Sequence, residues 1–355
     1  MNSLFDSLSL RGVTFKNRVW VSPMCQYSAQ DGFVAPWHQV HLGSFSSGGV
    51  GFIMVEATGV VPEGRITIGC LSIEDDKHAQ AFRPIIEFAH SQGAKIGIQL
   101  AHGGRKASTM QPWSDHLIAD VSEGGWQTVA PSAIAYEGYP EPRELSKQEI
   151  NSLVESFASA AARAVKVGFD VIEIHAAHGY LLHQFYSPKA NTRTDEYGGN
   201  FDGRTRFLRE VVEAVRKAIP DETPLFVRIS ATDWVDDGWN IIDSIELSRI
   251  LKDLGVDLID VSTGGNVHNA PIKPSPGYQV PFAAAIRKEA EIPTTAVGLI
   301  TEPEQAQYII ETGEADAVFL ARELLRNPRW ALNAAEKLGI KIDWPNQLQW
   351  ARTLL

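Results

Sequence analysis

Short apolar runs alternate with longer amphipathic segments along most of the chain. Eight runs are rich in Val, Ile, Leu and Phe; they begin at Arg18, Gly51, Ala94, Phe169, Pro224, Val256, Pro293 and Ala315. Between most of them, apolar residues recur at helical spacing, over residues 146–167, 204–218, 242–254 and 302–311. Glycine, the preferred residue just past a helix end, stands before several runs, at Gly93, Gly168, Gly255 and Gly313. The pattern predicts eight β-strands that alternate with α-helices.

Alternation of strands and helices implies parallel strands joined by right-handed crossovers, and eight such units fit a closed barrel. We therefore predict an α/β fold, a (β/α)8 TIM barrel that forms a single domain over residues 1–355. Such a barrel needs roughly 250 residues. The excess is expected as a hairpin within residues 1–17, an insertion after the third strand at about 102–145, and a C-terminal tail at about 327–355.

The insertion follows a strand, and loops after strands form the active face of such barrels, so we expect it to be a lid. The alternative fold is an open, doubly wound sheet. It is disfavoured because no GxGxxG motif follows the first strand.

Composition and charge narrow the range of partners. Hydrophobic residues make up 44% of the chain and charged residues 21%, which is ordinary for a soluble globular protein. The net charge of −11 argues against nucleic acid or an anionic membrane as the main partner. No apolar run is long enough to span a bilayer and no signal-peptide pattern opens the chain, so a cytoplasmic location is expected. The two cysteines, Cys25 and Cys70, cannot supply the four ligands of a typical iron–sulfur cluster.

Polar residues at the carboxyl ends of barrel strands are candidates for chemistry. Gln99, His175 and Arg228 close the third, fourth and fifth predicted strands. The two-residue period of a strand puts Val171, Glu173 and His175 on one face, which points inward if the intervening isoleucines pack under the helices. One such polar residue could simply make an interior hydrogen bond. Three polar residues at one level on neighbouring strands indicate a functional site.

The segment HAAHGYL is the densest polar cluster. Small residues separate His175 from His178, and Gly179 permits a turn that brings both rings to one side. Two donors converging on one oxygen would polarise a carbonyl or nitro group, and Tyr180 is a suitable general acid. A structural role and a metal site are the alternatives. His-x-x-His alone is weak evidence for a metal, no third ligand is evident, and the HExxH pattern is absent.

Other strand ends add candidates. Cys25 follows the first strand at the barrel mouth, where it is either a small buried residue or part of the chemistry. Loops after the seventh and eighth strands form the usual phosphate site of such barrels. Gly298 permits a close backbone approach there, and Arg322 can bind a phosphate unless it is a surface arginine. His38 and His41, in the helix predicted after the first strand, are expected to be packed or solvated rather than metal ligands.

Six segments make the chain resemble the Old Yellow Enzyme family of FMN-dependent ene-reductases. They are NRVWVSPMCQYSA, GFIMVEAT, IQLAHGGRKAS, EIHAAHGYLLHQF, SPKANTRTDEYGGNFDGRTRF and AVFLAREL. The resemblance extends from the first strand to the eighth, and NTRTDEYGG together with HAAHGYL is highly specific. It is strongest to the bacterial NADPH dehydrogenase branch, often called thermophilic-like, which includes xenobiotic reductases.

The resemblance implies FMN as cofactor and NADPH, or alternatively NADH, as hydride donor. The residues that match the flavin site are Ser22, Pro23, Met24, Cys25, Ala57, Gln99, Arg228, Gly298, Ala321 and Arg322. In the family pattern, Gln99 faces the pyrimidine edge and Arg228 lies near flavin N1 and O2. The last three residues of the list form the phosphate site. Cys25 replaces the threonine of the yeast-type branch and would tune the flavin potential.

The resemblance also implies a reaction, in which hydride passes from NADPH through FMN to the activated C=C bond of an α,β-unsaturated carbonyl or nitro compound. Nitro xenobiotics are further expected substrates. His175 and His178 match the pair that holds the substrate oxygen, Tyr180 the proton donor, and Tyr27 a second substrate-facing tyrosine. Arg352 is hypothesised to reach a neighbouring subunit's active site.

A homodimer or homotetramer is expected, with neither nucleic acid nor membrane as partner. Two alternative functions are a metal-dependent barrel hydrolase and a non-catalytic flavin-binding or redox-sensing protein.

Overall fold

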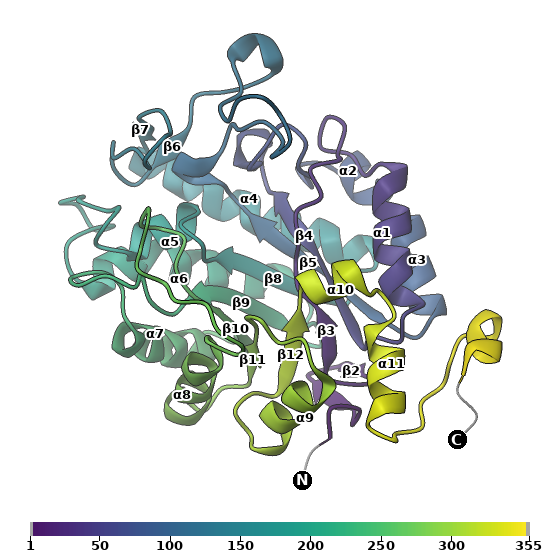
Figure 1. Cartoon of the computed structure of the whole chain (residues 1–355). Helices are drawn as coiled ribbons and strands as arrows, with labels where there is room; N and C mark the ends of the chain where they lie inside the picture. The colour runs from purple at the N-terminus through teal and green to yellow at the C-terminus, as the bar shows by residue number, and fades with distance from the viewer. Residues whose placement is uncertain (1–2, 353–355) are drawn as a thin grey trace.

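Eight parallel strands close into a barrel in a computed structural model that describes residues 3–352 (Figure 1). In order around the barrel they are β3 (Val19–Val21), β4 (Phe52–Gly59), β5 (Lys95–Ala101), β8 (Val171–Ala176), β9 (Leu225–Ser230), β10 (Leu258–Ser262), β11 (Thr294–Ala296) and β12 (Ala317–Leu320). The closing contact is the parallel pairing of β12 with β3. Each strand lies on one of the eight predicted runs, so the predicted barrel is confirmed and the open sheet is wrong.

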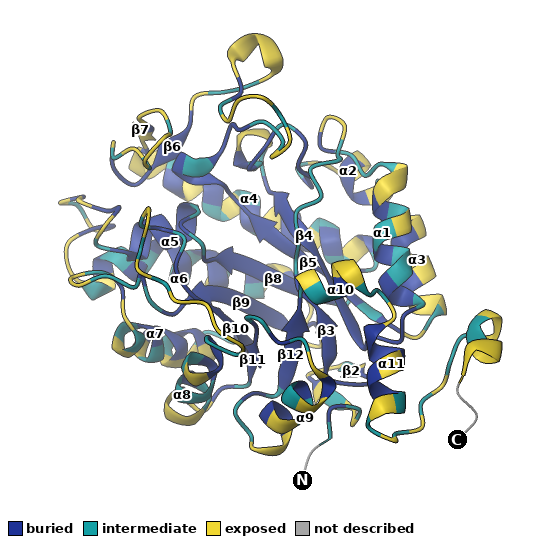
Figure 2. Ribbon diagram, viewed as in Figure 1, coloured by how far each residue is buried: buried dark blue, intermediate teal, exposed yellow. Residues whose placement is uncertain are grey.

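Helices surround the barrel, and Figure 2 shows their buried faces turned towards the strands and their exposed faces outward. The longer ones are α1 (Pro36–Ser46), α3 (Arg83–Ser91), α4 (Lys147–Val167), α6 (Phe201–Ala218), α7 (Ile241–Asp253), α8 (Val280–Ala290), α9 (Pro303–Glu311) and α11 (Trp330–Lys337). The shorter ones are α2 (Asp76–Ala81), α5 (Leu181–Tyr186), α10 (Arg322–Arg326), and the 3-10 turns η1 (Pro62–Gly64), η2 (Gly104–Lys106), η3 (Val121–Glu123) and η4 (Asn346–Ala351).

Helix α4 illustrates how the sequence sets these boundaries. The Ser146 hydroxyl accepts a hydrogen bond from the Glu149 amide, and the Glu149 carboxylate accepts one from the Ser146 amide, which makes a capping box. Gly168 ends the helix in the left-handed conformation, with φ +117°. The other three glycines predicted at helix ends, Gly93, Gly255 and Gly313, also have positive φ.

The predicted alternation along β8 is correct. Val171 lies in the cluster that fills the barrel, whereas Ile172 and Ile174 lie in the cluster between strands and helices. Glu173 and His175 therefore share the inward face with Val171.

The predicted N-terminal hairpin closes the amino end of the barrel. Strands β1 (Leu8–Leu10) and β2 (Val13–Phe15) pair antiparallel. The Phe15 ring enters the barrel interior, with its centroid 4.7 Å from that of Trp20 and 5.2 Å from that of Phe52. Because aromatic side chains fill the amino end of the barrel, we expect the active site at the carboxyl end.

The insertion between β5 and α4 occupies residues 102–146 and contains the two-stranded sheet of β6 (Val129–Ala130) and β7 (Arg143–Glu144). Figure 1 shows it beyond the carboxyl ends of the strands, where the lid was predicted. It is tied to the loop after β4, because the Thr109 amide donates to the Ile66 carbonyl (3.2 Å) and the Thr109 carbonyl accepts from the Ile68 amide (3.1 Å).

The C-terminal tail lies at the other end. Residues 342–347 line a cavity of about 580 Å³ together with Asn17, Gly49 and Gly93, which come shortly before β3, β4 and β5. None of the predicted site residues lines this cavity. No helix within the described residues is long and apolar enough to cross a lipid bilayer.

Candidate active site

A belt of buried polar side chains lies inside the barrel below its mouth. Gln99 Nε2 donates to Glu173 Oε1 at 2.7 Å. Arg228 Nε lies 3.0 Å from Asp260 Oδ2, and the Thr295 hydroxyl donates to Asp260 Oδ1 at 2.8 Å. Asp260 was missed by the sequence analysis, although the two-residue period along β10 puts it on the inward face with Leu258.

The strand register relates Gln99, Glu173, His175 and Arg228 to one another. His175 pairs with Arg228, whereas Gln99 pairs with Glu173, two residues before His175. Only His175 and Arg228 lie directly in register. Because the strands of such a barrel are tilted and the side chains of one layer come from alternate strands, the shared level of Gln99, His175 and Arg228 stays a prediction. Gln99 and Arg228 both belong to the belt beneath the mouth.

The three residues of HAAHGYL come together as predicted. His175 ends β8, and left-handed backbone at His178 (φ +59°) and Gly179 (φ +71°) turns the chain back. The ring centroid of His175 lies 5.3 Å from that of His178 and 5.2 Å from that of Tyr180. Burial raises the pKa of the Tyr180 phenol well above its ordinary value, so this group keeps its proton.

Both imidazoles are neutral. Burial, aided by the positive charge of Arg228, holds the pKa of His175 and of His178 well below 6.5. Each ring then carries one N–H, and the position of that proton decides what the ring can donate. His175 Nδ1 is enclosed and has no partner within residues 3–352. A buried N–H donor without an acceptor is rarer in proteins than a buried acceptor without a donor. The imidazole proton of His175 is therefore assigned to Nε2.

The proton of His178 is placed by Ser262, at the end of β10. Gln279 Nε2 donates to the Val297 carbonyl (3.1 Å), so Gln279 Oε1 faces the Ser262 hydroxyl at 3.3 Å. The Ser262 hydroxyl lies much closer to His178 Nε2, at 2.7 Å. Its single proton is therefore assigned to that nitrogen, which leaves the imidazole proton of His178 on Nδ1 without an acceptor in the described chain.

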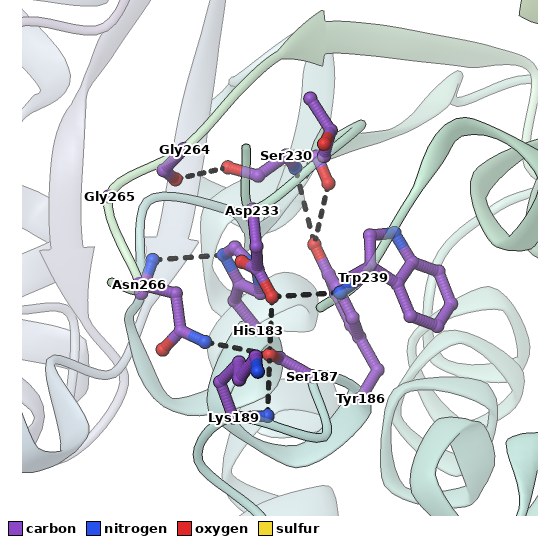
Figure 3. A network of polar contacts seen from close by, with 12 residues as sticks. His183, Tyr186, Ser187, Lys189, Ser230, Asp233, Trp239, Gly264, Gly265 and Asn266 are labelled. Atoms are coloured by element: carbon purple, nitrogen blue, oxygen red, sulfur yellow. Dashed lines mark hydrogen bonds and ion pairs between the residues drawn. The ribbon is translucent and has the colours of Figure 1, made fainter. Parts of the chain in front are cut away.

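A fully buried network supports this turn from behind (Figure 3). His183 Nδ1 accepts from the Gly179 amide at 3.0 Å, and His183 Nε2 lies 3.0 Å from Asp233 Oδ1. Asp233 Oδ2 accepts from the Ser187 hydroxyl at 2.6 Å, and Asn266 Nδ2 donates to that hydroxyl at 2.8 Å. His183 is the third histidine of the stretch HAAHGYLLH. Its position in the motif was the available signal, and it was overlooked.

Lys106 is a third residue that the sequence analysis missed. It lies in the matched segment IQLAHGGRKAS at the start of the insertion. Its Nζ donates to the carbonyls of His178 and Gly265, both at 2.8 Å, and lies 5.0 Å from the ring centroid of Tyr180. Burial lowers the pKa of Lys106 to about 8, so at neutral pH it brings a positive charge to the mouth.

The loop after β8 and the loop after β10 touch backbone to backbone. A Cβ added at Gly265 would lie 2.6 Å from His178 Cα, and one added at Gly179 would lie 2.6 Å from Asn266 Cα. Both glycines have positive φ, at +89° and +71°. Neither position accommodates a side chain, so the glycines fix the spacing of the two loops.

The segment after β3 runs past the belt and the mouth. The Ser22 hydroxyl accepts from Arg228 Nη2 at 3.2 Å. Pro23 and Met24 are half-buried. Cys25 and Tyr27 then pack with Ala57 and Tyr180 in one small cluster, which brings these predicted flavin and substrate residues together.

The predicted phosphate site is a cavity of about 220 Å³ at the ends of β11 and β12, whose wall includes Gly298, Ala321 and Arg322. Gly298 has φ +117°, and a Cβ there would lie 2.8 Å from Gln279 Nε2. Arg322 has no carboxylate partner within the described residues, and α10 begins at it. A small cavity, an uncommitted guanidinium and a glycine backbone fit a phosphate group.

Arg352 is the predicted site residue that this chain does not bring to the site. It is exposed and ends η4, in the tail that packs at the amino end of the barrel. The hypothesis that it serves a neighbouring subunit stays a prediction.

The helix histidines are packed, as expected. His38 Nδ1 accepts from the Ala35 amide at 2.9 Å and its Nε2 lies 3.4 Å from Glu56 Oε1. His41 packs against Trp37 and Phe45, and burial lowers its pKa to about 4. Within residues 3–352, the one group of three potential metal ligands is Cys25, Glu56 and Cys70, which contains neither His175 nor His178.

Comparison with known proteins identifies the family. Residues 3–340 match the model of the NADH:flavin oxidoreductase / NADH oxidase family. The NADPH dehydrogenase of Geobacillus thermodenitrificans (strain NG80-2) is 49% identical over 349 residues, which cover 98% of this chain and 97% of that protein. The NADPH dehydrogenase of Bacillus subtilis (strain 168) is 47% identical over 349 residues, or 98% of both chains.

Solved structures agree. Morphinone reductase in complex with tetrahydroNAD superposes with a TM-score of 0.79 at 26% identity, covering 98% of this chain and 93% of that chain. A complex of 2-naphthoyl-CoA reductase has the same barrel, with a TM-score of 0.86, but at 22% identity and over 52% of its length it shows the fold alone. The chain therefore belongs to the NADH:flavin oxidoreductase / NADH oxidase family and is a flavin oxidoreductase enzyme of the Old Yellow Enzyme and NADPH dehydrogenase type.

Proposed function

We propose that this enzyme reduces the activated C=C bond of α,β-unsaturated carbonyl and nitro compounds, with FMN as its resident cofactor and NADPH as hydride donor. The 220 Å³ cavity with Gly298 and Arg322 would hold the FMN phosphate. Gln99, Arg228 and the segment from Ser22 to Cys25 would line the ring. Bound there, FMN would supply hydride transfer from the nicotinamide to the β-carbon of the substrate.

The neutral imidazoles act on the substrate oxygen. His175 Nε2–H and His178 Nδ1–H are two donors without acceptors in the described chain, on rings 5.3 Å apart. An oxygen held by both withdraws electron density from the alkene, and the bonds strengthen as negative charge develops on that oxygen. The positive charge of Lys106 also favours the build-up of negative charge on the substrate oxygen. Tyr180, kept protonated by burial, donates its proton to the α-carbon.

The observation that carries this proposal is the neutrality of the two imidazoles with one free N–H each. A metal-dependent hydrolase would also use neutral imidazoles, but His178 Nε2 is already engaged by the Ser262 hydroxyl, and no carboxylate or thiol joins the pair among the described residues. Tyr180 beside the pair argues against a flavoprotein without catalysis.

The test is spectroscopic and kinetic. The purified protein should show flavin absorbance, bleach with NADPH under anaerobic conditions, and regain colour with 2-cyclohexenone. His178→Ala should slow the recovery of flavin colour by the enone roughly 10²–10³-fold, the usual cost of one oxyanion donor. Bleaching of the same variant by NADPH should remain much faster than this recovery. A colourless protein contradicts the proposal. So does recovery in His178→Ala as fast as in the parent.

NADPH is preferred over NADH in this proposal because the relatives at 47–49% identity are named NADPH dehydrogenases. Bound tetrahydroNAD in morphinone reductase supports a nicotinamide donor without deciding between the two. Nitro xenobiotics would bind through a nitro oxygen at the same two imidazoles.

We further propose a homodimer or homotetramer in which Arg352 enters a neighbouring active site. Its exposure, and the full exposure of Trp350 beside it, support a contact outside this chain. Removal of residues 348–355 should raise the KM for enones and reduce the oligomer mass measured by light scattering. Unchanged kinetics and mass would refute the role.

A further inference from the structure

The two cysteines of this chain lie side by side next to the candidate active site. The sulfur atoms of Cys25 and Cys70 and a carboxylate oxygen of Glu56 all lie within 4.8 Å of one another. Cys25 follows β3 and is half-buried, whereas Cys70 lies between η1 and α2 and is fully buried. Both belong to the cluster that contains Tyr27 and Tyr180. The barrel thus joins two thiols that are distant in sequence.

Backbone hydrogen bonds hold the two cysteine segments together. The Ala29 amide donates to the Gly69 carbonyl at 2.8 Å, and the Ser72 amide donates to the Gly32 carbonyl at 2.9 Å. Neither cysteine belongs to a helix or strand. Because no barrel strand holds either cysteine, bringing the sulfur atoms from within 4.8 Å to the roughly 2.05 Å of a disulfide requires no strand to break.

The thiols are also chemically coupled. Their mutual hydrogen bond raises the pKa of Cys25 and lowers the pKa of Cys70, so the first proton of the pair leaves Cys70. Thr67 Oγ1, 3.3 Å from Cys70 Sγ, supports that thiolate. Cys25 is the more accessible of the two thiols. When peroxide oxidises one thiol to a sulfenic acid, a second thiol beside it captures that group as a disulfide.

From this geometry we propose that Cys25 and Cys70 are a reversible oxidation site that forms an intramolecular disulfide with hydrogen peroxide. Two S–H bonds and the O–O bond break, one S–S bond forms, and the peroxide leaves as two molecules of water. The sulfurs lose two electrons and the peroxide gains them. A reduced flavin reacts with oxygen to give hydrogen peroxide, so the proposed cofactor would supply the oxidant beside the pair.

The expected consequence is inhibition. A disulfide draws the Cys25 side chain towards Cys70 and away from the flavin that we propose it lines. This consequence rests on the proposed function, whereas disulfide formation does not, and the two are measured separately below. A thiol reductant should restore both thiols and turnover.

The experiment uses the holoenzyme, first reduced and then freed of reductant. Under hydrogen peroxide, the free thiols measured after denaturation should fall from two to none, and the intact mass should fall by about 2 Da, the two lost hydrogens. Peptide mapping should find one Cys25–Cys70 link within a single chain. Phosphine reductant should return the mass, the thiols and the rate of NADPH oxidation together.

Cys70→Ala is the matched control, and Cys70→Ser repeats it with a closer isostere. Each should oxidise NADPH at the parent rate, show no loss of 2 Da, and fail to recover by phosphine after peroxide treatment. Parent enzyme that keeps both thiols, gains oxygen atoms without a link, or links between chains overturns the proposal. A link that leaves NADPH oxidation unchanged overturns only the inhibition, and a colourless protein that still forms the link overturns only the proposed function.

Discussion

At the scale of single residues, the placement of two protons decides whether the mouth can activate a substrate. His175 and His178 are both neutral because burial opposes their charge. A neutral imidazole donates through one nitrogen only, so the atoms at the other nitrogen become part of the chemistry. The other nitrogen of His175, Nδ1, is enclosed and has no hydrogen-bond partner in the described chain. The other nitrogen of His178, Nε2, lies against the Ser262 hydroxyl.

The pKa values of His175 and His178 predict how the rate of flavin reoxidation depends on pH on the acid side. Because both lie well below 6.5, the imidazoles gain a second proton only at more acidic pH. The rate of flavin reoxidation by an enone should therefore stay flat as the pH falls from about 7 to about 6, whereas an ordinary histidine would titrate within this range. Stopped-flow measurements across the range check this, and an inflection near 6.5 would contradict it.

The alkaline side should depend on Lys106. Its pKa of about 8 means that its proton is lost as the pH rises through that value. The positive charge beside Tyr180 then disappears, and the reoxidation rate should fall. Lys106→Met should remove this alkaline step and react more slowly than the parent at pH 7. An alkaline step that persists in the variant would assign it to another group.

Ser262 should act as a positioning residue. In Ser262→Ala, His178 Nε2 has no donor, so its proton can move there and away from Nδ1. Loss of one hydrogen bond of about 1–2 kcal/mol predicts roughly a five- to thirtyfold slower reoxidation by enones. The ¹⁵N shifts of the His178 ring should report the changed tautomer.

The control is Thr263→Val, which removes a different hydroxyl from Gln279 Oε1 (2.6 Å) and does not touch His178. Equal effects in the two variants, or an unchanged tautomer in Ser262→Ala, would show that Ser262 is only structural.

At the scale of elements, the site depends on loops held against one another. The loops after β8 and β10 meet at Gly179 and Gly265, so a side chain at either must push them apart. Gly265→Ala should raise the KM for enones and lower the free energy of unfolding by more than the about 1–2 kcal/mol expected for a left-handed alanine alone. Enone kinetics and urea unfolding measure both effects.

Gly199→Ala is the matched control. Gly199 also has positive φ (+73°), but a Cβ there meets nothing within 4 Å. It should therefore lose stability without a change in KM. Equal KM values in the two variants would refute a role for the contact between the loops.

Elements and their order could be predicted from the sequence, and contacts between loops could not. The two-residue period of FDVIEIH placed Glu173 and His175 inward because a buried face leaves a local pattern. The partners of Lys106 are two backbone carbonyls, which exist in every residue type and leave no pattern. The pairing of Cys25 with Cys70, like that of His183 with Asp233, depends on how loops from different strands meet above the barrel.

At the scale of the whole molecule, stability and chemistry occupy opposite ends of the barrel. The hairpin fills the amino end with Phe15, which is fully enclosed against Trp20 and Phe52. Phe15→Ala should lower the free energy of unfolding by about 3–5 kcal/mol, as expected for a large cavity in a core. Flavin content and enone turnover should match the parent well below the unfolding midpoint. A specific loss of turnover there would show that the two ends are coupled.

The barrel and its three additions could be predicted from the sequence, because each lies outside the eight repeated units. The position of the tail could not. It packs against residues that precede β3, β4 and β5, and its sequence has no periodicity that specifies that surface. A role in a neighbouring subunit depends on an assembly, which is not encoded in any local pattern.

The two hydrogen bonds of Lys106 limit how such enzymes can be recombined. The lysine comes from the insertion after β5, yet its acceptors are carbonyls after β8 and β10. The insertion is therefore not an exchangeable module. A chimera with a relative's lid that lacks this lysine would leave both carbonyls without their donor, however well the lid itself folds. Designs that exchange the insertion to change the substrate range should keep Lys106, Gly179 and Gly265 together.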